Sequence, residues 1–170
     1  NGIFIWQDLS QSQLALVSDT LPGYPSVFAF MTEAQIASVQ ARDGTQDVTA
    51  AIQAAINANI TPTGGALYFP DGTYKITAAL VIPFGVGWRF VGASRNAVVL
   101  KQFTANTPIF SFEFNLTHAW VIEEISFDWD QQAIAADTSA VAILFGGAGG
   151  YTYFDWTVRR CSFSKGFRGI

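Results

Sequence analysis

A tryptophan-led motif occurs three times in this chain and restricts its possible folds more than any other feature. The copies begin at Trp88, Trp120 and Trp156, so they are 32 and 36 residues apart. In each copy Phe, Ile or Val stands two positions after the tryptophan, and serine stands six positions after it. Repeats of about 20–50 residues are typical of solenoids, in which each repeat forms one coil and packs on its neighbours. We therefore expect the three tryptophans to lie one above another.

Short apolar runs separate the copies of the motif and predict further strands in each coil. The runs 109–112 and 142–145 follow the first two copies, and strand-like segments at 65–70, 73–76 and 80–83 precede the first copy. Strands stacked in parallel hydrogen-bond to their counterparts one coil away, at a spacing of about 4.8 Å. The sequence therefore predicts an all-β solenoid, a parallel β-helix, in preference to a sandwich or a barrel.

The segment 47–60 has the pattern of a one-sided helix and stands just before the first strand. Asp47 is a suitable N-cap, because its side chain accepts hydrogen bonds and its charge suits a helix N-terminus. The first coil of a solenoid has an apolar end that needs a cover. We expect an N-terminal capping α-helix that turns an apolar side toward the coils, formed by Val48, Ala51, Ile52, Ala55, Ile56 and Ile60.

Residues 1–42 differ in pattern from the rest and contain a second predicted helix, which begins at Thr32. Thr32 and Gln35 have the spacing of a capping box. This helix is either an ordinary surface helix or part of a neck that docks onto another component, and the residues alone leave both interpretations open. We divide the chain into an N-terminal neck segment, 1–42, and the capping helix with the first coils, 43–170, and we expect further coils to follow.

Composition excludes several classes of function. Half of the residues are hydrophobic, yet none of the apolar runs reaches the roughly 18 residues that a membrane span needs. The net charge of −4 makes nucleic acid a poor partner. Cys161 is the single cysteine and His118 the single histidine, so an internal disulfide is impossible and a histidine-dependent active site would rest on one residue. We expect no cofactor and no metal site.

The repeat also predicts specific ion pairs. If the second and third copies of the motif stack in register, Glu123 and Glu124 lie beside Arg159 and Arg160 on the next coil. Opposite charges on adjacent strands favour such a register by roughly 0.2–1 kcal/mol per pair. We expect at least one Glu–Arg contact among these four residues.

The opening of the predicted coils resembles a known family. Residues 43–56 read D-G-x-x-D-x-T-x-A-I-Q-A-A-I, and residues 64–74 read G-G-x-x-Y-F-P-x-G-T-Y. This order of a capping helix and a strand pair is similar to the start of the pectate-lyase-like β-helix superfamily. The resemblance implies a right-handed parallel β-helix, and the coils up to residue 170 resemble the superfamily more loosely.

Residues 30–40 resemble a helix of phage tailspikes, in which an M-T-x-x-Q motif links a particle-binding segment to the coils. This resemblance implies a homotrimer in the virion tail that is joined to other tail or baseplate proteins through its N-terminal segment. It further implies an extracellular action at the bacterial surface, where the protein binds, and as a full-length depolymerase degrades, surface polysaccharide. The alternatives are a non-catalytic virion appendage and a secreted polysaccharidase of the polygalacturonase or pectate-lyase type.

Two carboxylates are the candidate catalytic residues. Strand alternation puts Asp128 and Asp130 on one face, about 7 Å apart, and glycoside hydrolases place their acid and base roughly 5–9.5 Å apart. Trp120, Trp129 and Trp156 are candidates for a platform on which a sugar ring stacks. The alternative is that both aspartates mark the end of a strand and that the tryptophans stack inside the protein. By resemblance to tailspikes, this segment lacks the complete active site, which lies on later coils or between subunits.

Overall fold

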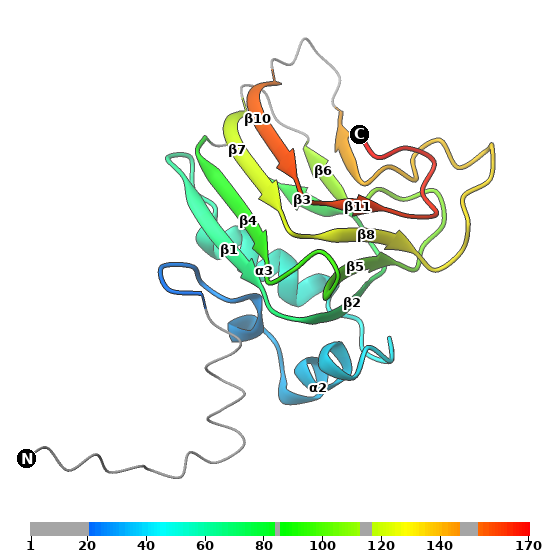
Figure 1. The fold of residues 1–170 in the computed structure, drawn as a ribbon, viewed down its shortest axis with the longest axis horizontal. Coiled ribbons are helices and arrows are strands. Elements are labelled where there is room, and N and C mark those ends of the chain that lie inside the picture. The colour runs from blue at the N-terminus through cyan, green and yellow to red at the C-terminus, as the bar shows by residue number, and fades with distance from the viewer. Residues whose placement is uncertain (1–20, 84–85, 113–116, 147–152) are drawn as a thin grey trace, which may run out of the picture.

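The computed structural model describes residues 21–83, 86–112, 117–146 and 153–170, and residues 1–20 of the predicted neck lie outside the described part. Within it, the strands form three parallel sheets that stand around a shared core (Figure 1). The first sheet contains β1 (Gly65–Phe69), β4 (Trp88–Gly92), β7 (Thr117–Glu123) and β10 (Tyr153–Arg159). The second contains β2 (Gly72–Ile76), β5 (Val98–Gln102), β8 (Ser126–Trp129) and β11 (Ser162–Phe163). The third contains β3 (Leu80–Ile82), β6 (Phe110–Phe112) and β9 (Ile143–Phe145).

Each strand pairs with the equivalent strand of the next coil, which confirms the predicted parallel β-helix. The chain passes from the first sheet to the second and then to the third before it returns to the first, one coil further along. The strand pairs are parallel in all three sheets. Parallel neighbours joined by long crossovers require this winding, whereas hairpins would give antiparallel pairs.

The three tryptophan-led segments lie one above another, as the repeat predicts. Trp156 pairs in register with Trp120, and their rings stack with centroids 5.7 Å apart. Arg89 pairs with Val121, which places Trp88 beneath Trp120. The ring of Phe112 lies between these two, 5.8 Å from Trp88 and 4.9 Å from Trp120. Aromatic packing therefore continues from coil to coil through the core.

Other core positions form similar rows. In the second sheet, Tyr74, Leu100, Phe127 and Phe163 occupy equivalent positions of successive coils. Phe127 and Phe163 stack almost in parallel at 5.3 Å. Burial of one such large side chain stabilises the fold by roughly 1.5–3 kcal/mol. The rows explain why a chain with few charges folds in this way, since the inward positions take apolar residues in every coil.

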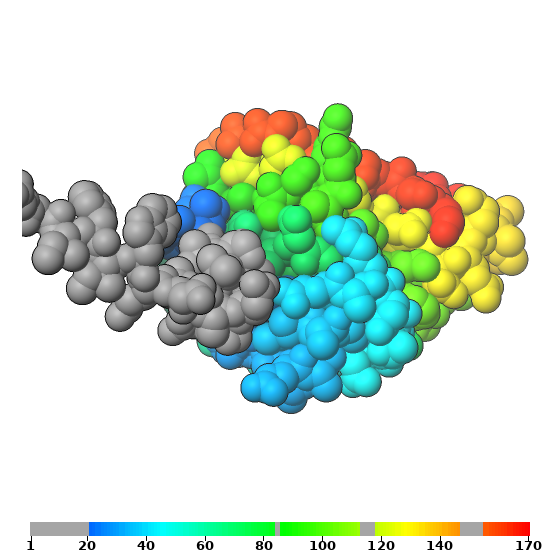
Figure 2. Space-filling view, turned by 60° about the horizontal axis from the view of Figure 1, so that its bottom comes forward, coloured from blue at the N-terminus to red at the C-terminus, as the bar shows by residue number. Residues whose placement is uncertain are grey.

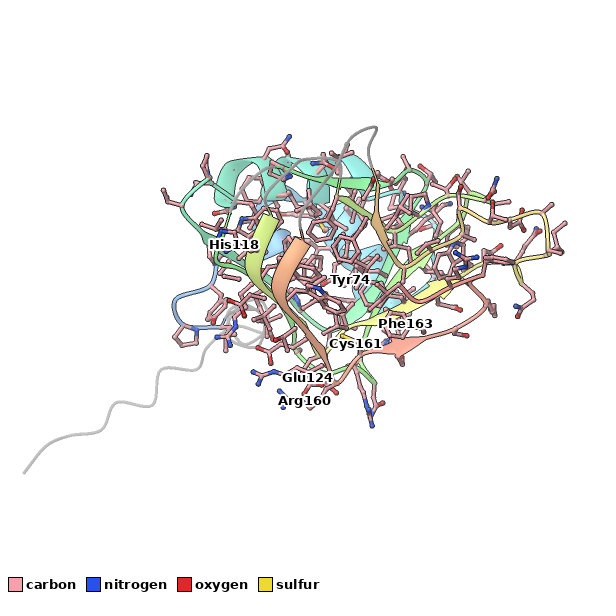
Figure 3. The ribbon with its side chains drawn as sticks, turned by 90° about the horizontal axis from the view of Figure 1, so that it is seen from above. Tyr74, His118, Glu124, Arg160, Cys161 and Phe163 are labelled. Atoms are coloured by element: carbon pink, nitrogen blue, oxygen red, sulfur yellow. The ribbon has the colours of Figure 1, made fainter. Side chains whose placement is uncertain are left out.

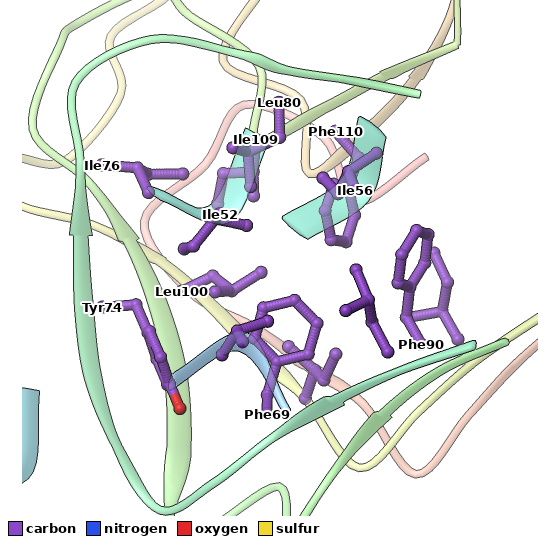
Figure 4. Packing of buried hydrophobic residues seen from close by; sticks show 14 of the residues in the cluster. Ile52, Ile56, Phe69, Tyr74, Ile76, Leu80, Phe90, Leu100, Ile109 and Phe110 are labelled. Carbon is purple, nitrogen blue, oxygen red and sulfur yellow. The ribbon is translucent and has the colours of Figure 1, made fainter. Parts of the chain in front are cut away.

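A helix covers the open end of the first coil. α3 (Thr49–Asn59) buries Ile52 and Ile56 completely, and Figure 4 shows both among the core residues of the coils. In the space-filling view of Figure 2, the helical residues, in blue and cyan, cover this end of the stack. The predicted capping helix is therefore confirmed.

The cap also satisfies the hydrogen bonds of the first coil. The Gln53 side chain accepts from the Val81 N–H at 2.8 Å and donates to the Val81 carbonyl at 2.9 Å, as a neighbouring strand would. The Tyr68 N–H donates to the Pro25 carbonyl at 2.9 Å, and the Val48 N–H donates to the Lys75 carbonyl at 3.0 Å. The N-terminal segment and α3 together thus replace a missing coil along all three sheets.

The start of α3 differs from the prediction. The N-cap position is Val48, which has no capping side chain. Asp47 lies one residue earlier, where its Oδ1 accepts from the Thr49 N–H at 2.9 Å and its Oδ2 accepts from the Thr77 hydroxyl at 2.6 Å. Asp47 therefore supports the first turn, but it also ties the helix to the end of β2, which the sequence did not indicate.

The N-terminal segment forms a short 3-10 helix, η1 (Val27–Phe30), and α2 (Glu33–Ala41). The predicted capping box is present: the Gln35 N–H donates to Thr32 Oγ1 at 3.3 Å, and the Thr32 N–H donates to Gln35 Oε1 at 3.0 Å. The Gln35 amide nitrogen also donates to the Asp47 carbonyl at 3.0 Å. None of the helices in the described part of the chain has the length and hydropathy that a membrane span requires.

Candidate functional site

Asp128 and Asp130 lie at the outer face and the end of β8, and each carboxylate faces a lysine. Lys101 Nζ is 2.9 Å from Asp130 Oδ1, and Lys165 Nζ is 3.6 Å from Asp128 Oδ2. Asp128 Oδ1 is buried and has no hydrogen-bond partner in the described part of the chain. The two side chains therefore lie close to the same surface, as strand alternation predicts, and each takes part in an ion pair with a lysine. Whether either carboxylate takes part in catalysis remains a prediction.

A pocket of about 290 Å³ opens beside the end of β8. Its walls are the loop after β5 and the long connection between β8 and β9. Its lining combines polar side chains with apolar and aromatic ones: Gln102, Thr104, Asn106, Gln131, Gln132 and Asp137 with Phe103, Trp129, Ala133 and Ile134. We call this the loop pocket.

Part of the polar lining holds the loops in place. The Ser139 N–H donates to Asn106 Oδ1 at 2.7 Å, and the Ile134 N–H donates to Asp137 Oδ2 at 3.0 Å. Gln102 is buried, and its amide bonds the backbone at Thr104 and Pro108. Gln131 and Gln132 are exposed at the rim. Fixed walls with exposed amides next to aromatic surface suit a neutral, hydroxyl-rich ligand.

The tryptophans divide into buried and exposed members. Trp120 is 1% exposed and Trp129 is 3% exposed, so a sugar ring has no access to their faces. The Gly166 backbone lies against the Trp129 ring, and the Trp129 indole N–H donates to the Thr107 carbonyl at 3.2 Å. For these two residues the structure favours the alternative of internal stacking. Trp156 is 42% exposed, and its role as a sugar platform remains a prediction.

Charged residues gather where the first sheet turns into the second. Arg159 Nε contacts Glu123 Oε2 at 2.5 Å, Arg160 also reaches Glu123 at 3.3 Å, and Arg160 Nε pairs with Glu124. Figure 3 shows Glu124 and Arg160 side by side at this corner. The predicted Glu–Arg contacts are therefore confirmed. The sequence did not predict a further contact, in which Arg89 Nε lies 3.4 Å from Glu123 Oε1.

The electrostatics of this corner follow from these contacts. The hydrogen bond to Glu123 and the charge of that carboxylate raise the pKa of Arg159 above its usual value. A hydrogen bond from the Arg95 backbone and the Arg160 guanidinium lower the pKa of Glu124 against the opposing effect of burial.

The remaining candidate for nucleophilic chemistry is poorly placed. Cys161 is half-buried, and burial raises the pKa of its thiol, which disfavours the reactive thiolate. Among the described residues, His, Cys, Asp and Glu side chains form no group of three that could hold a metal ion.

Sequence reasoning missed the loop pocket and the role of Arg89. The signal for the pocket was the distance from Trp129 to Ile143, which is long for a turn between two strands, and long loops often carry function. The signal for Arg89 was its place one residue after Trp88, on the strand that neighbours β7.

Comparisons with known proteins agree with the geometry. A family model described as "Rhamnogalacturonase A/epimerase, pectate lyase-like" matches residues 40–162. Curated proteins include no match to the sequence. Among solved structures, the protein ORF18 of Geobacillus virus E2 is similar, with a TM-score of 0.54 and 25% identity over 89% of this chain. The matched part is 28% of the length of that viral protein.

Proposed function

Because this chain belongs to the rhamnogalacturonase A/epimerase, pectate-lyase-like family, we propose that it forms the first coils of a phage tailspike that binds bacterial surface polysaccharide. The similarity to a viral protein supports the assignment to a phage, and that protein's greater length fits a longer tailspike. In this proposal the protein is a homotrimer in the virion tail, and residues 1–42 form the neck that joins it to other tail proteins.

The observation that carries the proposal is the loop pocket. It stands on the outside of the stack, it is large enough for a single sugar residue, and it presents the exposed amides of Gln131 and Gln132 beside the partly exposed Phe103. Rigid scaffolds with functional loops are a common way to build a binding site. Gln131 and Gln132 are the residues that we expect to bind sugar hydroxyls.

Binding is the role that these coils support best, and cleavage is the second candidate. Asp128 and Asp130 have the alternation that a pair of catalytic carboxylates needs, but their ion pairs with Lys165 and Lys101 also suit a structural role. We propose that the full-length trimer degrades the polysaccharide and that these coils bind it. A non-catalytic shaft would bind without shortening the glycan.

The test uses capsular polysaccharide and lipopolysaccharide from a panel of bacterial hosts. Binding is measured by calorimetry, and shortening of the glycan is measured by size-exclusion chromatography. We expect Gln131→Ala to weaken binding several-fold, because one or two hydrogen bonds are lost. Gln46→Ala, an equal truncation at an exposed site shortly before α3, is the matched control and leaves the affinity unchanged.

The outcomes separate the candidate functions. Equal affinity of the Gln131→Ala variant and the wild-type protein, or binding to none of the glycans, contradicts the proposed site. Shortening that Asp128→Asn and Asp130→Asn both abolish assigns catalysis to these carboxylates. Shortening that survives both changes places the chemistry elsewhere in the trimer.

A further inference from the structure

A second pocket, of about 390 Å³, lies on the outer face of the first sheet beside the charged corner. Arg89, Arg159 and Arg160 line it together with Glu123 and Glu124, and Val91, Gly92 and Ala93 also belong to its lining. We call this the arginine pocket. It is separate from the loop pocket, with which it shares no lining residue.

The N-terminal segment closes one side of the arginine pocket. Leu21 lines the pocket and forms a bridge with Tyr24. The hydroxyl of Tyr24 accepts a hydrogen bond from an Arg89 terminal nitrogen at 2.9 Å. The pocket is therefore built from the coils and the N-terminal segment together, and Tyr24 holds Arg89 in a defined orientation.

The charge of this corner is opposite to that of the whole chain. The chain carries a net charge of −4, whereas the corner contains four arginines, with Arg95 next to the pocket, and two glutamates. Four positive and two negative groups leave an excess of two positive charges. A local positive excess in an acidic protein attracts anions.

The arginines also have donors to spare. A guanidinium group has five N–H donors in a planar fork. In the described part of the chain, the contacts of Arg159 with acidic side chains use only its Nε, and those of Arg160 use its Nε and one terminal nitrogen. The side chains of Arg89, Arg159 and Arg160 are 40%, 47% and 56% exposed. Glu123, at 6%, is the buried anchor that holds the three guanidinium groups around one point.

We infer that the arginine pocket binds the anionic group of an acidic sugar, a carboxylate or a phosphate ester. Arginine forks match both groups through paired, charge-assisted hydrogen bonds. That the anion belongs to a sugar rests on the proposed function, whereas the recognition of an oxyanion rests on the pocket alone. The two pockets would then bind different parts of one polysaccharide: the loop pocket a neutral sugar, and the arginine pocket a charged one.

The test titrates the protein at low ionic strength with three probes: sodium glucuronate, inorganic phosphate and glucose. We expect glucuronate or phosphate to bind at least tenfold more tightly than glucose, and we expect added salt to weaken that binding. Tighter binding of glucuronate identifies a carboxylate as the preferred group, and tighter binding of phosphate identifies a phosphate ester. Chemical shifts of the arginine side chains locate the anion.

Arg160→Gln is expected to weaken anion binding about tenfold, because it removes a charged fork. Arg160→Lys keeps the charge without the fork and gives an intermediate affinity. Arg42→Gln removes one positive charge from the exposed C-cap position that follows α2 and is the matched control, with unchanged affinity. Arg89→Gln is a second variant from a different strand, and thermal melting confirms that each variant is folded.

Equal anion affinity in Arg160→Gln, Arg89→Gln and the wild-type protein overturns the inference, and so does equal affinity for glucose and for both anions. Polysaccharide binding that persists without any preference for anions overturns the inference and leaves the proposed function standing. Anions bound at these arginines, with binding to none of the bacterial glycans, overturn the proposed function and leave the anion site standing.

Discussion

Glu123 connects three coils through one carboxylate. It lies on β7 and contacts Arg89 of the coil before and Arg159 and Arg160 of the coil after. Its neighbour Glu124 turns outward with a left-handed backbone, φ 59°, as does Arg160 at the same corner one coil further on, φ 50°. Two adjacent glutamates therefore have different surroundings, one nearly buried and one half-buried.

This difference predicts unequal costs for the same substitution. Glu123→Gln should lower the free energy of unfolding by about 2 kcal/mol, because a buried acceptor loses its charge-assisted hydrogen bonds. Glu124→Gln is the matched control and should cost much less, since water reaches its partners. Urea denaturation with an unchanged m-value measures both. Equal losses for the two variants would show that burial of Glu123 does not matter.

For individual residues, the sequence predicted side-chain contacts more accurately than it predicted burial. The Glu–Arg pairs follow from the alignment of two motif copies, because register alone decides which side chains are opposite. The burial of Trp120 and Trp129 does not follow, because alternation assigns a residue to a face but does not say what covers that face. Arg89 was missed because its contact with Glu123 is diagonal to the register.

The cap is the element that differs most from a simple interpretation of its sequence. α3 covers the core with Ile52 and Ile56, as its apolar side predicts, but it also replaces strand hydrogen bonds through Thr49 and Gln53. Propensity and periodicity describe a helix by itself and carry no information on polar partners in other elements. Strand bounds were predicted more closely: the expected strands 65–70, 73–76 and 80–83 differ by one residue from β1, β2 and β3.

Asp47 gives the cap a dependence on pH. Burial raises the pKa of Asp47, but hydrogen bonds from Thr49 and Thr77 and the charge of Lys75 outweigh it, so the pKa is lowered. A lowered pKa in the folded state stabilises the fold above the ordinary value of about 3.9, and this contribution is lost as the pH falls through the folded-state pKa. Asp47→Asn removes the charge that strengthens these hydrogen bonds and should therefore cost about 1 kcal/mol at pH 7.

The difference between Asp47→Asn and the wild-type protein should shrink when the pH falls below about 3.9. Chemical denaturation from pH 7 to pH 2.5 follows this difference. Asp71→Asn, a change of the same type in an exposed turn, serves as the control. A difference that stays constant across this range would mean that the charge of Asp47 makes no contribution.

At the scale of the whole molecule, stability is passed along a stack in which each coil contacts mainly its neighbours. The stacking and order of the coils that begin with β4, β7 and β10 could be predicted from the spacing of the tryptophan motifs, whereas the first coil begins with β1, which has no tryptophan. The loop pocket and the arginine pocket could not, because each depends on how connections of unequal length fold over the outer faces. The repeated motif predicts the strands that all coils share, whereas the two pockets depend on residues and loops that differ between the coils.

A stack of this kind should lose its structure from a damaged end. Ile52→Ala creates a cavity under the cap and should cost about 2–5 kcal/mol. In hydrogen exchange, the loss of protection should be greatest in β1, β2 and β3 and should decrease through the following coils. Phe127→Leu, a core change in the third coil, is the comparison and should centre its effect on β5 and β8. Uniform loss of protection in both variants would indicate a single cooperative unit.

The amide of Gln53, which pairs with Val81 in the place of a strand, also bears on how such proteins evolve. This contact is made with a strand of the first coil, so the cap does not depend on the number of coils that follow. Duplication of one repeat downstream would lengthen the stack by one coil and leave the contacts of the cap intact. A lineage can thus vary the length of the stack while it inherits the same cap.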